Sequence, residues 1–197
     1  MEEFNVVICG MGGQGVLTLM EIIALAAKNQ GYEVRTSEVH GLSQRFGSIQ
    51  THVRFGKNIY SPLVMQNDAD LIIALEPLES LRVLNYASKK TAFLINTYKI
   101  PPQTIYLENI EYPSLESIEK EIKKITQKVF WVDATSASIK HFGSAISTNI
   151  AMLAYSLKLN LLPITKENVL KGMRERWKDE RFEKNKELIE KILKGEY

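Results

Sequence analysis

The chain has 197 residues, 45% of them apolar, and its 25 basic and 23 acidic side chains leave a net charge of +2. This length fits one large α/β domain, and the near-neutral charge excludes the basic footprint of a nucleic-acid-binding protein. The acidic N-terminus and the short apolar runs predict neither a signal peptide nor a membrane partner. The single cysteine, Cys9, excludes an internal disulfide, so a cytoplasmic location is expected.

Strands and helices are predicted to alternate from the N-terminus onward. Residues 4–9 are typical of a buried strand closed by glycine, and residues 14–30 carry an apolar helical face that ends at Gly31. Residues 33–38 alternate like a second strand. A strand, a glycine turn, a helix and a strand in this order form a βαβ unit, which predicts a parallel pair of strands with a right-handed crossover.

The same alternation continues to residue 173. Further strands are predicted at 50–55, 71–75, 92–95, 104–107 and 129–132, and helices from Pro77 and over 114–128, 144–158 and 165–176. Together they predict an α/β fold over residues 1–173: a doubly wound, mostly parallel sheet with helices on both faces, similar to a Rossmann fold. Residues 174–197 combine both charge signs with spaced apolar residues, which predicts a C-terminal helix packed on this domain or on a partner.

A glycine-rich turn, Gly10-Met-Gly-Gly-Gln-Gly15, joins the first strand to the first helix. It matches the G-x-G-x-x-G pattern, in which glycines permit a tight turn and let an anion approach the helix N-terminus. Glu38 follows at close to the usual distance of about 20 residues for an acid that binds a ribose. The predicted cofactor-binding residues are Gly10, Gly12, Gly13, Gln14, Gly15 and Glu38. The alternative is a turn that serves only close packing or a protein neighbour.

A second polar, glycine-punctuated segment runs from Ser37 to Ser48. His40 is a candidate general base and Arg45 a candidate anion clamp, but no Asp or Cys stands inside the segment to complete a nucleophilic triad. The alternative is a structured loop that docks on the glycine turn or on another chain. The predicted interface residues are Ser43, Gln44, Arg45, Gly47 and Ser48.

Polar residues also follow most of the predicted strands. In open parallel sheets, ligands bind outside the carboxyl ends of the strands, and these residues would line that edge. Loop solvation explains any one of them equally well. They are Glu38, Glu76, Asn96, Thr97, Asp133 and Thr135. Three scattered histidines and one cysteine provide no metal site and no ligand set for an iron–sulfur cluster.

Several segments together resemble one protein family. They are Gly10-Met-Gly-Gly-Gln-Gly-Val16, Glu38-Val-His-Gly-Leu-Ser-Gln-Arg45, His52-Val-Arg-Phe-Gly56 and Asp70-Leu-Ile-Ile-Ala-Leu-Glu-Pro77. The chain resembles the gamma-type subunits of 2-oxoacid:ferredoxin oxidoreductases, and among them the small (beta) subunits of the indolepyruvate enzymes. One departure is that Phe46 precedes a single Gly47, where the family often has two glycines after Ser-Gln-Arg.

The resemblance implies a small subunit that is inactive alone and pairs with a larger chain carrying thiamine diphosphate and iron–sulfur clusters. The complex would convert an aryl 2-oxoacid such as indolepyruvate to an acyl-CoA and reduce ferredoxin. The glycine turn and the segment after Glu38 would border a shared active site or a path for CoA, with Arg45 or Gln14 holding an anionic group. Two alternatives remain: a stand-alone nucleotide- or CoA-binding module, and an independent dehydrogenase with His40 as its acid or base.

Overall fold

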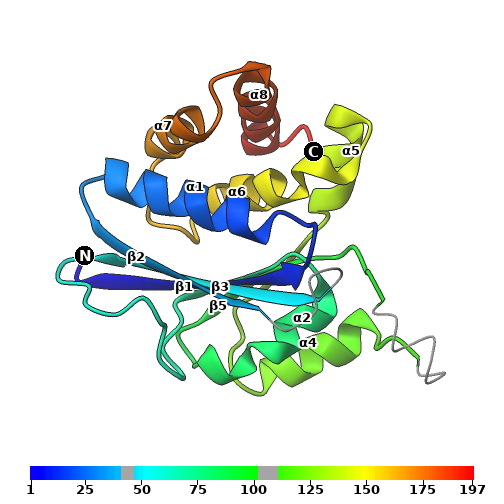
Figure 1. The fold of residues 1–197 in the computed structure, drawn as a ribbon. Helices are drawn as coiled ribbons and strands as arrows, with labels where there is room; N and C mark the ends of the chain where they lie inside the picture. Colours follow the sequence, from blue (N-terminus) through cyan, green and yellow to red (C-terminus); the bar gives the residue numbers. More distant parts are fainter. Residues whose placement is uncertain (41–46, 102–110) are drawn as a thin grey trace.

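A six-stranded sheet runs through the middle of the molecule and carries helices on both faces (Figure 1). The computed structural model describes residues 1–40, 47–101 and 111–197, and of His40 only the backbone. The strand order is β2-β3-β1-β4-β5-β6. The strands are β1 (Glu3–Met11), β2 (Glu33–His40), β3 (Ser48–Gly56), β4 (Leu71–Ala74), β5 (Ala92–Asn96) and β6 (Val129–Val132).

The predicted α/β fold is confirmed, with one correction. β1, β4, β5 and β6 pair in parallel, whereas β3 pairs antiparallel with both β1 and β2. β1 and β2 therefore run in the same direction, as the βαβ prediction requires, but they are not hydrogen-bonded to each other. The expected parallel pair is wrong in this respect, because β3 inserts between them and satisfies the backbone groups of both.

Helices cover the two faces of the sheet unequally. α1 (Val16–Asn29), α5 (Ala134–Phe142) and α6 (Thr148–Lys158) lie on one face, and α2 (Pro77–Arg82) and α4 (Leu115–Lys123) on the other (Figure 1). α7 (Lys166–Arg176) and α8 (Glu180–Lys194) form an outer layer, in which α7 packs on α1 and α8 on α6. Two short 3-10 helices, η1 (Leu84–Tyr86) and η2 (Ala145–Ser147), complete the described elements.

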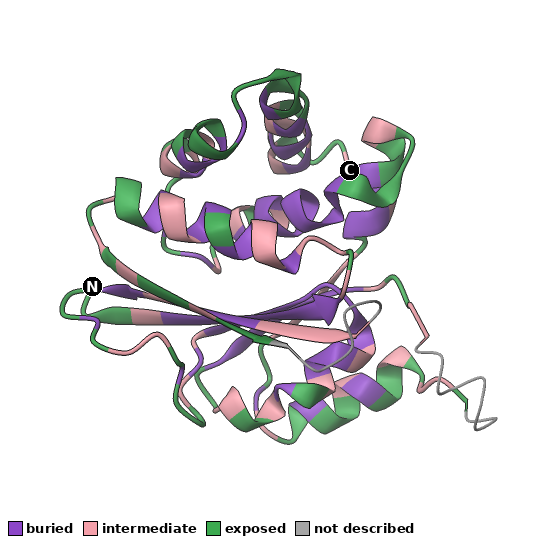
Figure 2. Ribbon diagram, viewed as in Figure 1, coloured by how far each residue is buried: buried purple, intermediate pink, exposed green. Residues whose placement is uncertain are grey.

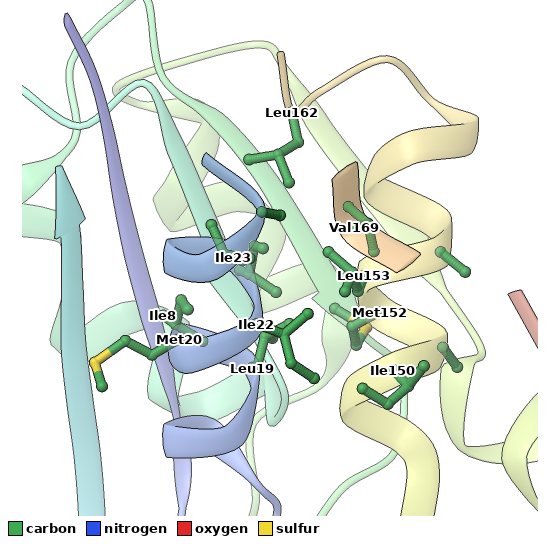
Figure 3. Packing of buried hydrophobic residues seen from close by; sticks show 14 of the residues in the cluster. Ile8, Leu19, Met20, Ile22, Ile23, Ile150, Met152, Leu153, Leu162 and Val169 are labelled. Atoms are coloured by element: carbon green, nitrogen blue, oxygen red, sulfur yellow. The ribbon is translucent and has the colours of Figure 1, made fainter. Parts of the chain in front are cut away.

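The central strand β1 divides the core into two halves. Because successive side chains point to opposite faces, Val6 and Ile8 face α1, whereas Val7 and Cys9 belong to the cluster on the other face. Figure 2 shows buried residues concentrated on the central strands and on the helix sides facing them. In Figure 3, Leu19 and Ile22 of α1 lie towards Met152 and Leu153 of α6.

The observed helices differ from the predicted ones at the C-terminal end of α4 and at α5. The helix predicted over 114–128 ends at Lys123, because the residues up to Thr126 turn back towards β6 and Thr126 Oγ1 donates to the carbonyl of Thr91. α5 was not predicted. α7 ends at Arg176, as predicted, so the predicted domain boundary at residue 174 falls inside this helix, and the division of the chain there stays a prediction. The strand predicted at 104–107 lies outside the described residues.

None of the helices in the described ranges combines the length and apolar character that crossing a lipid bilayer requires.

Candidate functional site

The glycine turn lies between the end of β1 and the start of α1, and α6 packs directly against it. Gly15 is the N-cap of α1 in the left-handed conformation, with φ of 80°. Its carbonyl oxygen accepts a hydrogen bond from Asn149 Nδ2 at 3.0 Å. A Cβ atom at Gly15 would lie 2.4 Å from that nitrogen. Gly15 is therefore required by both its backbone conformation and its contact with α6.

Gln14 bridges the ends of β1 and β4. α1 follows β1 on one face of the sheet and α2 follows β4 on the other, and ligands of doubly wound folds usually enter at such a switch point. Here Gln14 Nε2 donates to the carbonyl oxygen of Leu75 at 3.1 Å, and Gln14 Oε1 accepts from Met11 N–H at 2.7 Å. A Cβ atom at Gly10 would lie 2.8 Å from that Oε1. Gly10 therefore makes room for the Gln14 side chain.

The other two glycines have different surroundings. Gly12 N–H donates to the carbonyl oxygen of Gly47 at 2.9 Å, which joins the turn to the end of the second polar segment. Gly13 has φ of 98°, and a Cβ atom there would meet no described atom within 4 Å. Of Gly10, Gly13 and Gly15, Gly13 is thus the one whose surroundings in the described residues leave space for an external group.

Two cavities meet at Gly13. One, of about 260 Å³, extends from Gly12 and Gly13 to Tyr98, Ile100 and Thr148. The other, of about 360 Å³, extends from Gly13 and Gly15 to Phe142, Ile146, Trp177 and Arg181. Each has an apolar side chain exposed at its mouth: Tyr98 is 50% exposed and Ile146 78% exposed. The edge around Gly13 therefore presents apolar surface and two hollows, a pattern typical of a protein interface.

The remaining predicted site residues are not gathered at one point. Glu38 is exposed on β2 opposite Thr51 of β3, so a whole strand separates it from β1. His40 ends β2 opposite Ile49, and its side chain, like Ser43, Gln44 and Arg45, lies outside what the structure describes. Their proposed roles stay predictions.

Two of the polar residues predicted at the strand ends, Asn96 and Thr135, meet near the end of β4. Asn96 is fully buried, and its Nδ2 donates to the Leu75 carbonyl at 3.2 Å and to Thr135 Oγ1 at 2.9 Å. Its Oδ1 accepts from Ala134 N–H at 3.1 Å. The Leu75 carbonyl therefore accepts from both Gln14 and Asn96. Asp133 caps α5 through a bond from Ser136 N–H at 2.9 Å.

Glu76 and Glu79 are buried carboxylates on the first turn of α2. Glu76 Oε1 accepts from the Tyr112 hydroxyl at 2.5 Å and from Ile100 N–H at 3.1 Å, and its Oε2 accepts from Glu79 N–H at 3.1 Å. Ser48 Oγ donates to Glu79 Oε2. Burial raises the pKa of Glu76, against the hydrogen bonds that stabilise its charged form. Burial and the bond to Glu76 raise the pKa of Tyr112, so its hydroxyl remains a donor.

The chain does not fit the ligand set of an iron–sulfur cluster. Such clusters are held by several cysteine thiolates, and the sequence contains only Cys9. Cys9 is buried in β1, and its pKa is raised by desolvation and by the charges of Glu79 and Glu76. Among residues 1–40, 47–101 and 111–197, no group of three or more His, Cys, Asp or Glu side chains is placed to hold a metal ion.

Sequence reasoning missed Asn149 and Tyr112. Asn149 contacts Gly15 across 134 positions of the chain, and Tyr112 reaches Glu76 across 36. Neither residue belongs to a local motif, so no sequence signal pointed to them.

Comparison with known proteins identifies the family. Residues 5–194 match the family described as pyruvate ferredoxin/flavodoxin oxidoreductase. The chain is 38% identical over 175 residues to the indolepyruvate oxidoreductase subunit IorB of Pyrococcus horikoshii, covering 88% of this chain and 86% of the relative. It is 39% identical over 176 residues to that of Archaeoglobus fulgidus, covering 89% and 87%.

Two solved structures share the fold. The pyruvate oxidoreductase subunit PORC of Thermotoga maritima matches with a TM-score of 0.67 at 16% identity, covering 96% of this chain and 94% of that one. A 2-oxoglutarate:ferredoxin oxidoreductase from Magnetococcus marinus matches with a TM-score of 0.74 at 16% identity, and the whole of this chain spans 32% of that longer chain. The chain therefore belongs to the pyruvate ferredoxin/flavodoxin oxidoreductase family.

Proposed function

We propose that this chain is the small subunit of an indolepyruvate:ferredoxin oxidoreductase. In the complex, an aryl 2-oxoacid is oxidatively decarboxylated to an acyl-CoA while ferredoxin is reduced. The observation that carries the proposal is the match, over 88% or more of the chain, to indolepyruvate oxidoreductase subunits of 38% and 39% identity. The gamma subunits shared by pyruvate and ketoisovalerate oxidoreductases are more distant, at 26% identity for that of Pyrococcus abyssi.

The redox cofactors belong to a larger partner subunit in this proposal. The single buried cysteine supports that division, because this chain offers no set of thiolates. Thiamine diphosphate is likewise assigned to the partner. CoA enters through the complex, as the CoA-bound neighbour of the same fold supports. The location of the complex is the cytoplasm.

The carboxyl edge around Gly13 is the surface that receives the larger subunit. Gln14 bridges the ends of β1 and β4 through its bonds to Met11 and Leu75, so its side-chain amide is already engaged in the subunit and is not free for a ligand. Gly13 leaves open space between two cavities, and exposed Tyr98 and Ile146 supply apolar anchors. A partner segment that approaches the Gly13 backbone closely would be blocked by any side chain there.

Gly13→Ala and Gly31→Ala form a matched pair that tests this surface. Both glycines have positive φ, 98° and 89°, and open space around the missing Cβ, so both variants carry the same backbone strain of about 1–2 kcal/mol. Only Gly13 lies at the carboxyl edge. With the purified larger subunit, we expect Gly13→Ala to raise the dissociation constant at least about tenfold. We expect Gly31→Ala to leave it unchanged.

Activity of the complex is measured as ferredoxin reduction with indolepyruvate and CoA. We expect activity from the two subunits together and none from either alone. Purification of this chain from native extract without a thiamine- and cluster-containing partner would contradict the proposal. Calorimetric binding of NAD, FAD, ATP or CoA by the isolated chain would instead favour the stand-alone module.

A further inference from the structure

Three segments of the carboxyl edge converge on the first turn of α2. The Glu79 carboxylate accepts a hydrogen bond from the Ser48 hydroxyl. Ser48 directly follows Gly47, whose carbonyl accepts a hydrogen bond from Gly12 N–H in the glycine turn. The Glu76 carboxylate accepts hydrogen bonds from Ile100 N–H and from the Tyr112 hydroxyl. In the sequence, these two residues flank residues 102–110. Glu76 is 1% exposed, so these bonds form away from water. The two ends of the 98–113 segment are therefore held by one carboxylate oxygen.

Tyr112 adds a second contact between these ends. The Lys99 ammonium lies 5.2 Å from the centre of the Tyr112 ring, within reach of a cation–π interaction. The Tyr112 hydroxyl accepts a hydrogen bond from Leu78 N–H at 3.1 Å while it donates to Glu76. Tyr112 is thus joined both to α2 and to the residues around Lys99.

The residues held in this way wall the cavity beside Gly13. Tyr98 and Ile100 line the smaller cavity opposite Gly12 and Gly13. Tyr98 is followed by only one residue before Ile100, whose N–H is the group bound by Glu76. We therefore expect a change at Glu76 to displace this wall of the cavity, because the Ile100 N–H would lose its acceptor.

We propose that Glu76 is a positioning residue that fixes Tyr98 and Ile100 for contact with the larger subunit, through its bonds to Ile100 N–H and the Tyr112 hydroxyl. The identity of the partner rests on the proposed function. Glu76 also caps α2 by accepting from Glu79 N–H. Capping uses Oε2 and positioning uses Oε1, so substitutions can separate the two roles.

Glu76→Asp keeps the N-cap of α2 but is too short to accept the hydrogen bonds from Ile100 N–H and the Tyr112 hydroxyl. Asp is a preferred N-cap residue, but its side chain is one methylene shorter. Glu76→Gln does the reverse: its amide oxygen keeps the two bonds from Ile100 and Tyr112, while its NH₂ group faces the Glu79 N–H and cannot accept from it. Tyr112→Phe removes one of the two positioning bonds. Ser114→Ala removes the cap of α4, which follows the same segment, and leaves Glu76 untouched.

The test measures three quantities for each variant: the dissociation constant for the larger subunit, the melting temperature, and amide hydrogen exchange at residues 98–101. We expect Glu76→Asp to raise the dissociation constant about tenfold, to speed exchange at 98–101 and also to lower the melting temperature, because the buried Ile100 N–H and Tyr112 hydroxyl lose their acceptor. Tyr112→Phe should behave similarly but less strongly. Glu76→Gln and Ser114→Ala should lower the melting temperature and leave the dissociation constant, measured well below it, within about twofold of the wild type.

Two results would overturn the inference. One is a Glu76→Asp protein that binds the larger subunit as tightly as the wild type. The other is unchanged exchange at residues 98–101 in that protein, which can be read on the isolated chain. If the wild type itself fails to bind the larger subunit, the proposed function fails, and the exchange experiment still decides whether Glu76 positions Tyr98 and Ile100.

Discussion

Gln14 donates a hydrogen bond of 3.1 Å to the backbone carbonyl oxygen of Leu75 and so ties the glycine turn to the end of β4. The pattern G-x-G-x-x-G usually leaves this crevice open for a phosphate-bearing ligand. In this chain Gln14, a residue inside the pattern, bridges the two sides of the crevice, and Gly10 is small enough to accommodate that side chain. Part of the motif, Gly10 and Gln14, therefore serves the internal packing of the subunit.

Replacing Gln14 with Glu is expected to destabilise the isolated chain by about 1–3 kcal/mol. The carboxylate can still accept from Met11 N–H, but it cannot donate to Leu75, and an acceptor then faces that carbonyl. Urea unfolding followed by circular dichroism measures the loss. Gln127→Glu is the matched control, because exposed Gln127 also donates to a backbone carbonyl, that of Lys123. Equal losses of unfolding free energy in the two variants would show that the bond from Gln14 to Leu75 stabilises the chain no more than an exposed bond does.

Gly172→Ala tests the close approach of α7 to α1. A Cβ atom at Gly172 would lie 3.0 Å from the backbone nitrogen of Ala26 and 3.2 Å from the carbonyl oxygen of Ile22. Alanine favours helix by about 1 kcal/mol over glycine, yet separating two packed helices typically costs about 1–3 kcal/mol. We expect a net loss of stability on chemical unfolding. The neighbouring exposed variant Lys171→Ala should change stability by less than about 0.5 kcal/mol, and a Gly172→Ala protein more stable than the wild type would refute the argument.

The stability of the chain is expected to rise with pH between about 4 and 6.5 because of His52. This fully buried imidazole accepts a hydrogen bond at Nδ1 from Val64 N–H, at 3.0 Å. Burial lowers its pKa from 6.5 to about 4. Within that window the unfolded chain binds a proton that the folded chain does not, so stability falls as the pH drops. Unfolding free energies at intervals from pH 4 to pH 7 test this. His52→Gln should flatten the dependence, and an identical pH profile in that variant would count against it.

Several elements were determined locally. The apolar runs of β1 and β4 have few alternatives to a buried strand, and the apolar spacing of α1 fixes its buried side. α5 carries local signals as well, because Asp133 caps its N-terminus and Gly143 ends it in the left-handed conformation. Its apolar residues do not recur clearly at the helical spacing, so the helix was not predicted. The insertion of β3 between β1 and β2 could not be foreseen, because pairing of distant strands depends on which edges remain free after folding.

By itself, the sequence determined where the glycine turn lies, which elements flank it and which family the chain resembles. Only the tertiary structure decided how each glycine is used. Gln14 reaches a carbonyl 61 positions away, and Asn149 reaches Gly15 across 134 positions, so the space around Gly10 and Gly15 is set by residues that no local pattern contains. Gly13 is left open for the same reason: in the described residues, no distant side chain folds onto it.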